Sequence, residues 1–267
     1  MYKLIVDIIA RLIFVRKYRE QFLKNAFKKD KYKYKCNICG NMSVFLMAGA
    51  NPLSNKKCSI CGSTERNRLL YMALENYYFI DDRLDKNIKL LHTAPEECIY
   101  KALSKNKNIE YYPTDISPNL YPNVPCIEAD VTNLPFDDNY FDLILSGHVI
   151  EHIEDENKML SEFNRVLKDD GTIFLSFPYS PQYKKTFEDS SINTPYKRKK
   201  KYGQSDHVRL YGLDAIDRFS KYFDVKIINP EDIADKQTIK MTSLDQTLYV
   251  SLKFSLKNML MILTKKK

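Results

Sequence analysis

Apolar and polar segments alternate between residues 88 and 228 in a way that predicts buried strands joined by helices. Residues 141–146, broken only by Asp142, and residues 172–177 are apolar runs typical of strands buried on both faces. The apolar positions between these runs recur at the helical period: Met159, Leu160, Phe163, Val166 and Leu167. A strand, a crossover helix and a second strand within about forty residues form a βαβ unit, which needs a parallel sheet covered by helices.

The same patterns predict the other elements of an α/β protein. Further strands are expected at residues 88–93, 109–114, 124–129, 222–228 and 247–252. Helices are expected at residues 64–80 and 214–219. Three prolines exclude a full helix from residues 117–125. The tail from residue 253 has the pattern of an amphipathic basic helix, for which we expect no particular role.

The stretch from residue 141 to residue 178 resembles one segment of class I S-adenosylmethionine-dependent methyltransferases of the type 11 kind. The resemblance rests on two strings, Val149-Ile150-Glu151-His152-Ile153 and Arg165-Val166-Leu167-Lys168. It extends from residue 88 to about residue 253. It implies a doubly wound Rossmann-like sheet of seven strands, the last of them antiparallel. The implied organisation is a methyltransferase domain at 64–253 followed by a basic C-terminal tail at 254–267.

Two Cys-x-x-Cys pairs predict a zinc ribbon at residues 31–63. Each pair is followed by a glycine: Cys36-Asn37-Ile38-Cys39-Gly40 and Cys58-Ser59-Ile60-Cys61-Gly62. This spacing places four thiolates around one Zn²⁺, and glycine permits the left-handed backbone that turns amides toward sulfur. Two unrelated reduced dithiols are the alternative. Four cysteine ligands leave no open coordination position, so we expect this site to support folding and docking, not catalysis.

The pattern of apolar and basic positions in residues 1–30 predicts an N-terminal amphipathic helix that packs on the body of the protein. The alternative is peripheral membrane contact through residues 1–20, because an interfacial helix has the same apolar face and basic flank. The apolar run 4–15 contains Asp7 and Arg11 and is shorter than the roughly 20 residues that span a bilayer, so no transmembrane segment is expected. Cysteines arranged for metal binding indicate a reducing compartment, and we expect a cytoplasmic protein.

The net charge of +8 raises the alternative of a nucleic-acid partner. Lysine, asparagine, isoleucine and tyrosine are all abundant and all have A/T-rich codons, so base composition accounts for much of this charge. Lysines around the predicted ribbon leave an RNA methyltransferase or RNA-binding protein as an alternative function. We do not favour it, because the chain has no Asn-Pro-Pro-Tyr or Asp-Pro-Pro-Tyr motif for amine methylation.

The turn after the first predicted strand departs from the Gly-x-Gly of typical methyltransferases. The chain has Leu90-Leu91-His92-Thr93-Ala94-Pro95-Glu96 there, and no two of its seven glycines are spaced Gly-x-Gly. The missing glycines argue against a nicotinamide or flavin site, because a pyrophosphate needs that glycine-rich turn. S-adenosylmethionine has no phosphate. An Ala-Pro-Glu turn resembles a subset of these enzymes that carries a zinc ribbon, and a non-catalytic methyltransferase-like scaffold is the alternative.

Acidic residues at strand ends predict the rest of the cofactor site. Asp115 follows the second strand and is placed to accept hydrogen bonds from both ribose hydroxyls, or else to cap the turn that follows. The resemblance implies that Asp130, with the amide of Val131, reads the adenine edge. Four residues are expected to line the methionine end of the cofactor: Ala94, Glu96, Ser146 and His148.

The long polar segment 178–212 is expected to bind the methyl acceptor, because long loops of this kind commonly act as lids or binding elements. Its basic run 197–201 is read as a solvated surface. Asp206 and His207 are predicted to act as a carboxylate-assisted general base on a hydroxyl, and Arg209 to bind an anionic or carbonyl group of the acceptor. The alternative is that these three residues pin the segment to the sheet. A small molecule or a glycan is the expected acceptor.

Overall fold

The computed structural model describes residues 34–43, 45–47, 56–78, 87–244, 248–251 and 254–266. The helix expected at residues 1–30 lies outside these ranges, as does the membrane contact expected from residues 1–20. Within the described ranges, no helix combines the length and the hydrophobicity that crossing a bilayer requires.

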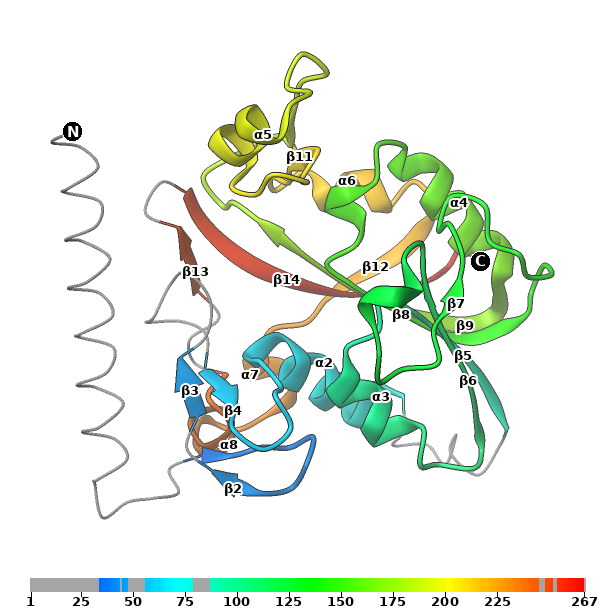
Figure 1. Ribbon diagram of the computed structural model, residues 1–267, viewed down its shortest axis with the longest axis vertical. Coiled ribbons are helices and arrows are strands. Elements are labelled where there is room, and N and C mark those ends of the chain that lie inside the picture. Colours follow the sequence, from blue (N-terminus) through cyan, green and yellow to red (C-terminus); the bar gives the residue numbers. More distant parts are fainter. Residues whose placement is uncertain are drawn as a thin grey trace, which may run out of the picture.

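An eight-stranded mixed sheet forms the centre of the molecule (Figure 1). Seven strands lie in the order β12-β14-β9-β8-β5-β6-β7, and the eighth, β13, pairs with β14. Their bounds are β5 (Ile88–Thr93), β6 (Ile109–Asp115), β7 (Ile127–Glu128), β8 (Phe141–Gly147), β9 (Leu167–Tyr179), β12 (Phe223–Ile227), β13 (Leu248–Ser251) and β14 (Phe254–Lys265). The five strands from β5 to β9 are parallel, and β14 runs antiparallel to both β9 and β12. The predicted Rossmann-like α/β fold is confirmed.

Helices cover both faces of this sheet (Figure 1). One face packs against α2 (Glu65–Tyr77), α3 (Glu97–Leu103), α7 (Pro230–Ile233) and α8 (Lys236–Thr242). The other packs against α4 (Glu156–Val166) and α6 (Ala215–Phe219). Leu143 and Leu145 of β8 point to the first face and Ile144 to the second, because successive side chains of a strand alternate. Two separate hydrophobic cores result, and they hold the parallel strands rigidly in register.

The helix predicted for the tail is wrong, because residues 254–265 form strand β14. Met259 and Leu263 are buried between β9 and β12, and Met261 pairs with both Leu175 and Ile227. A strand buried on two faces is a continuous apolar run, which periodicity alone does not separate from a helix. The strand predicted at residues 247–252 is β13, and β14 is its partner among the described strands. The antiparallel strand of the sheet is therefore β14.

Two small antiparallel hairpins precede the sheet. They consist of β1 (Tyr34–Lys35) with β2 (Met42–Ser43), and β3 (Phe45–Met47) with β4 (Lys56–Cys58). Ile38 lies in the turn between β1 and β2, and Cys61 lies in the turn between β4 and α2. Both pack against the core that α2 and α3 share. The segment predicted to be a zinc ribbon therefore docks on the same face of the sheet as α2.

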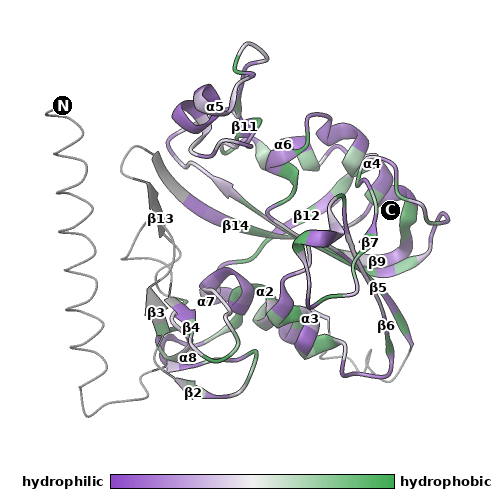
Figure 2. Cartoon of the chain, viewed as in Figure 1, coloured by the Kyte–Doolittle hydropathy of each residue, from purple (hydrophilic) through white to green (hydrophobic). Residues whose placement is uncertain are grey.

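The segment expected to bind the acceptor has its own short elements above the other face. They are β10 (Phe187–Glu188), α5 (Pro195–Tyr202) and β11 (Arg209–Leu210), and β10 pairs with β11. Helix α5 carries the basic run, is mostly purple in Figure 2, and exposes Lys199, Lys200 and Lys201. Two 3₁₀ turns complete the description, η2 (Pro118–Leu120) and η3 (Ile150–His152).

Candidate functional site

The residues predicted to bind the cofactor gather at the carboxyl ends of the parallel strands. Thr93 of β5 lies opposite Thr114 of β6 and Ser146 of β8, and Asp115 lies opposite Glu128 of β7. The predicted positions lie in the last residues of these strands or just after them: Ala94, Glu96, Asp115, Asp130, Val131, Ser146 and His148. Open α/β sheets bind ligands at this edge, and the register brings the predicted cofactor residues to that one edge of the sheet.

The turn after β5 keeps a left-handed residue although it lacks glycine. Ala94 has a φ of 49°, and its amide donates to the carbonyl of Thr114. The carboxylate of Glu96 accepts from Nδ2 of Asn67 at 3.0 Å and lies 2.9 Å from Nε2 of His92. Burial alone would raise the pKa of Glu96, but the hydrogen bond and charge of His92 outweigh it and lower that pKa. A fixed negative charge therefore stands at the turn.

Gly147, at the end of β8, lets the carboxylate of Glu96 approach the sheet. A Cβ at this position would lie 3.0 Å from Oε1 of Glu96 and 3.5 Å from the hydroxyl of Ser176. Beside it, the hydroxyl of Thr93 donates to that of Ser146 at 2.9 Å. Gly147 thus leaves the space beside β8 that the carboxylate of Glu96 occupies.

Both predicted aspartates also hold their own turns. Asp115 accepts from the amide of Ser117 at 2.7 Å and from the hydroxyl of Tyr121 at 3.0 Å. Oδ1 of Asp130 accepts from the amide and the hydroxyl of Thr132, each at 2.8 Å. The capping alternative for Asp115 is therefore observed. A carboxylate has about four acceptor positions, so these contacts leave each aspartate able to bind a ligand.

His148 directly follows β8, at the edge of the sheet where the predicted cofactor residues lie. Its φ is 57°, its Nδ1 lies 3.1 Å from Oε1 of Glu151, and its Nε2 lies 2.8 Å from Oδ1 of Asn258. The contact to Asn258 comes from β14 and was missed in the sequence, where this stretch has the pattern of a helix. Both ring nitrogens are engaged, which fixes the ring at the end of β8.

His207 is buried and neutral. Its side chain is 2% exposed, and its Nε2 has no hydrogen-bond partner among the described residues. Burial lowers the pKa of His207 to about 4. The ring packs edge-on against that of His152, with 4.7 Å between centroids. Desolvation disfavours the imidazolium, so the unperturbed pKa of histidine does not apply to this ring.

Asp206 faces a different histidine from the one expected. Its carboxylate lies 3.4 Å from Nδ1 of His152, and its side chain is exposed. Neighbouring residues of an extended segment point to opposite sides, so Asp206 turns outward while His207 turns inward. The predicted partnership of Asp206 and His207 is replaced by one between Asp206 and His152.

Arg209 holds the chain in place. It is 4% exposed and donates to three backbone carbonyls in and after η3, those of Ile150, Ile153 and Glu154, and its Nε donates to Glu188 at 2.9 Å. Tyr211 is fully buried and donates to Glu156 at 2.7 Å. The contacts of Arg209 match the alternative in which it pins the segment, and Tyr211 anchors the same segment in the core.

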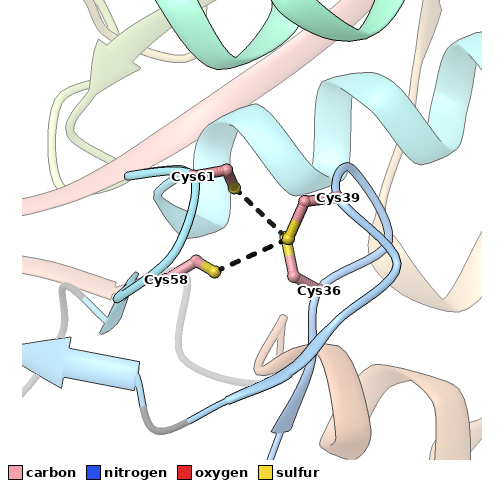
Figure 3. A group of neighbouring side chains, drawn as sticks. All are labelled: Cys36, Cys39, Cys58 and Cys61. Carbon is pink, nitrogen blue, oxygen red and sulfur yellow. Dashed lines mark hydrogen bonds between the residues drawn. The ribbon is translucent and has the colours of Figure 1, made fainter.

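The four cysteines of the two hairpins converge (Figure 3). The sulfurs of Cys36 and Cys61 lie 3.6 Å apart, those of Cys39 and Cys58 lie 3.9 Å apart, and all four fall within 4.8 Å of one another. Tetrahedral Zn–S bonds of about 2.3 Å hold sulfurs about 3.8 Å apart. Hydrogen bonds with Cys61 and Ser63 hold the pKa of the Cys36 thiol at about 4, against the effect of burial. The donor set fits zinc.

The two cysteine turns have the same backbone pattern. The first turn is closed by Cys36 N to Asn41 O and Gly40 N to Cys36 O, and the second by Cys58 N to Ser63 O and Gly62 N to Cys58 O. Gly40 and Gly62 have φ values of 72° and 76°, as predicted from their position after each pair. This repetition arises because both turns are built from Cys-x-x-Cys-Gly.

Arg68 joins the cysteine hairpins to the helices. It is fully buried, and it donates to the carbonyls of Ser63 and Thr242, each at 2.8 Å. Its guanidinium also lies 4.2 Å from the centre of the Phe45 ring. Four thiolates around Zn²⁺ carry a net negative charge, so a buried cation beside them is favourable. The sequence gives no signal for this role, because Arg68 has the position of an ordinary helical residue.

Comparisons with known proteins agree with this architecture. Residues 97–175 match the model of a methyltransferase domain, a match that begins directly after the unusual turn. The chain is 28% identical over 171 residues to a 2-phytyl-1,4-naphtoquinone methyltransferase from Nostoc punctiforme, covering 63% of this chain and 60% of that protein. It is 36% identical over 69 residues to a demethylmenaquinone methyltransferase from Staphylococcus saprophyticus, covering 25% and 30%.

A solved structure shares the fold. It is a putative sarcosine dimethylglycine methyltransferase from Galdieria sulphuraria, with a TM-score of 0.50 and 16% identity, covering 78% of this chain and 91% of that one. The chain thus spans less than two thirds of the length of the curated relatives described above. The domain match and the relatives support a class I S-adenosylmethionine-dependent methyltransferase.

Proposed function

We propose that this protein transfers the methyl group of S-adenosylmethionine to a small-molecule acceptor. The observation that carries the proposal is the arrangement at the strand ends, where the ionised carboxylate of Glu96 stands beside Gly147 and one strand away from Asp115. A sulfonium and an ammonium both favour a fixed negative charge nearby. The match of residues 97–175 to a methyltransferase domain points to the same cofactor.

In this proposal each part of the crevice binds one part of the cofactor. Asp115 accepts hydrogen bonds from the ribose hydroxyls. Asp130 and the amide of Val131 bind the adenine edge. The methionine end is lined by the four residues that surround the turn and the end of β8: Ala94, Glu96, Ser146 and His148.

Calorimetry with S-adenosylmethionine and S-adenosylhomocysteine tests the cofactor. Asp115→Ala removes a hydrogen-bonding charge worth about 1.5–3 kcal/mol, so we expect binding roughly 10- to 100-fold weaker. Glu97→Gln is the matched control, because Glu97 is exposed and its ion pair is with Lys101 on the surface of α3. If the unmodified protein binds neither compound, the chain is a non-catalytic scaffold.

We infer a hydroxyl of the acceptor as the methylated group. Methyl transfer is an in-line displacement, so the protein acts mainly by holding the acceptor oxygen about 3 Å from the methyl. The sulfur leaves without an acid, but a hydroxyl must lose its proton. His207 stays our candidate for activating it, through the Nε2 that lacks a partner among the described residues. With a pKa of about 4, His207 alone is a weak base, so proton removal needs further help.

A quinone-type ring is a second candidate acceptor, favoured by the names of the two curated relatives. Carbon methylation of such a ring needs no hydroxyl acceptor. Incubation of cell extracts with labelled cofactor separates the candidates: label in the organic phase favours a quinone, and label in the aqueous phase favours a polar small molecule or a glycan. Chemical stability of the labelled product distinguishes an ether from a carbon-bound methyl group.

We also propose that Cys36, Cys39, Cys58 and Cys61 bind one Zn²⁺. Supporting this are the sulfur distances and the repeated turn geometry. Four protein ligands complete a tetrahedral shell, so the ion stabilises the hairpins and their docking on α2 and does not meet substrate. Metal analysis of the purified protein, together with the cysteine variant described in the Discussion, tests the site.

A further inference from the structure

We propose that Glu151, His152 and His207 form a second metal site, which binds a divalent transition ion such as Zn²⁺. One donor atom from each of the three residues lies within 4.8 Å of the other two. An ion about 2.1 Å from every donor holds the donors about 3.4 Å apart. Small side-chain rotations therefore suffice to close the three groups around an ion.

Two of the three residues have a buried polar atom without a hydrogen-bond partner among the described residues, which lowers the stability of the fold. Oε2 of Glu151 and Nε2 of His207 are buried, and neither has a hydrogen-bond partner among the described residues. The two residues are 1% and 2% exposed. A buried carboxylate oxygen and a buried imidazole nitrogen are both strongly disfavoured when unpaired. A cation between them removes both penalties at once, because each atom is an electron-pair donor.

Neighbouring polar groups orient the proposed ligands. Asp206 lies 3.4 Å from Nδ1 of His152, which leaves Nε2 of that ring for the ion. Nδ1 of His148 lies 3.1 Å from Oε1 of Glu151, and this contact fixes the carboxylate. Metal-binding histidines usually donate their second N–H to a carboxylate, and such outer partners set ring orientation and affinity. In this proposal Asp206 orients the ring of His152, a role that its solvent exposure alone does not suggest.

The backbone brings the three residues together before any ligand binds. Glu151 and His152 lie in η3, whose carbonyl of Ile150 accepts from Arg209. The amide of Val208 donates to the carbonyl of Glu151 at 3.0 Å, so His207 is tied directly to the same turn. A site held on a pinned turn loses little conformational freedom on binding. The geometry thus provides a reason for Arg209 to be buried there.

The donor set selects the kind of ion. Two imidazoles and one carboxylate suit zinc and its neighbours among the transition metals, whereas magnesium and calcium prefer oxygen donors alone. Three protein ligands leave a coordination position open, as in catalytic zinc sites. The role we assign to the ion rests on the proposed function and takes the place of His207 as the base: Nε2 of His207 becomes a ligand, and the ion binds the acceptor hydroxyl and lowers its pKa, so that the hydroxyl proton is lost to solvent.

Cobalt titration of the full-length protein, purified with zinc in the cysteine site, tests this inference. We expect one equivalent of Co²⁺ to bind, with weak visible absorption and without the intense sulfur charge-transfer bands that a thiolate site produces. Glu151→Gln and His207→Gln should each weaken Co²⁺ binding at least 100-fold. Glu154→Gln is the matched control, because Glu154 is the exposed acidic residue of the same stretch and should leave binding unchanged.

His152→Gln is a third ligand variant, and it should leave the fold intact because this histidine is about one third exposed. It therefore distinguishes loss of a ligand from loss of folding. The inference is overturned if the unmodified protein binds no Co²⁺ outside the cysteine site, or if all three ligand variants bind as the parent does. Binding of S-adenosylmethionine, measured on the same samples, separates this result from the proposed function. Cobalt without cofactor binding defeats the proposed function alone, and cofactor without cobalt binding defeats the metal site alone.

Discussion

The four-cysteine cluster and the cluster of Glu151, His152 and His207 are assembled in opposite ways. The cysteines come from two turns of identical pattern, and their hairpins dock on the core beneath α2. The second cluster joins η3 to a distant segment of the chain, above the core that α4 covers. Each cluster has a buried arginine beside it that donates to backbone carbonyls, Arg68 for the first and Arg209 for the second.

From this difference we expect a structural role for the four-cysteine cluster and a catalytic role for the cluster of Glu151, His152 and His207. Four sulfur donors close their coordination shell and leave nothing for a substrate. Three donors of mixed type leave a position open, and one of them, Glu151, contacts His148 at the end of β8. We therefore expect damage to the first cluster to unfold the protein and damage to the second to stop its reaction.

The largest expected effect is that of Cys36→Ser. Structural zinc supplies about 10–16 kcal/mol of folding free energy to small zinc-binding peptides, and a sizeable part of that should be lost here. We expect the melting temperature to fall by roughly 10 °C or more, with loss of one zinc per chain. Cys126→Ser is the control, because Cys126 lies outside the cluster and should change neither quantity. Equal melting temperatures for the two variants would remove the structural role.

Arg209→Leu should have the second-largest effect on stability. The change leaves three carbonyls without their charged donor and Glu188 with Arg218 alone, which should lower the free energy of unfolding by about 4 kcal/mol. Arg198→Leu serves as the control, since Arg198 pairs with the exposed Glu154 and should cost less than about 1 kcal/mol. Urea unfolding followed by circular dichroism measures both. A small effect at Arg209 with lost turnover would restore its predicted role at the acceptor.

Arg68→Leu should lower the free energy of unfolding by about 3 kcal/mol, because two buried carbonyls lose their donor. The zinc content should stay at its normal level, since the sulfur ligands remain. Arg68→Lys keeps the charge but not the two-directional hydrogen bonding, so we expect an intermediate urea midpoint. Loss of zinc from Arg68→Leu would show that the arginine belongs to the metal site as well as to the docking surface.

His152→Gln should have the smallest effect on stability, within about 0.5 kcal/mol, because its ring is partly exposed. Turnover with an identified acceptor should nevertheless fall roughly 10²- to 10⁴-fold, the usual range for loss of acid–base or equivalent activation. Cofactor affinity should not change. Single-turnover assays beside calorimetry test this, and unchanged turnover would exclude the second cluster from the chemical step.

Features set by neighbouring residues could be predicted from the sequence. The cysteine turns, the parallel strands and the crossover helix α4 depend on spacing and periodicity within short stretches. The acidic strand ends were also predictable, because parallel strands place their carboxyl ends at one edge. The partners of these residues were not, since contacts such as Asn67 with Glu96 or Asp206 with His152 depend on how distant elements pack.

Two errors have the same physical origin. Strand β14 was read as a helix because a strand covered on both faces shows no alternation. His207 was chosen as a base on the unperturbed pKa of histidine, but burial lowers the pKa of this ring to about 4, and the sequence around it does not reveal that burial. In both cases the deciding quantity was how much of the residue the rest of the chain covers.

The position of β14 in the sheet also determines the order in which the protein can fold on the ribosome. Both neighbours of this strand, β9 and β12, are synthesised before it, so each has an open edge until residues 254–265 emerge. Open strand edges pair readily with other chains, and contacts between distant residues form slowly. The contact of His148 with Asn258 joins residues 110 positions apart. The contacts of His148 are therefore completed late in synthesis, by the same strand that covers the open edges of β9 and β12.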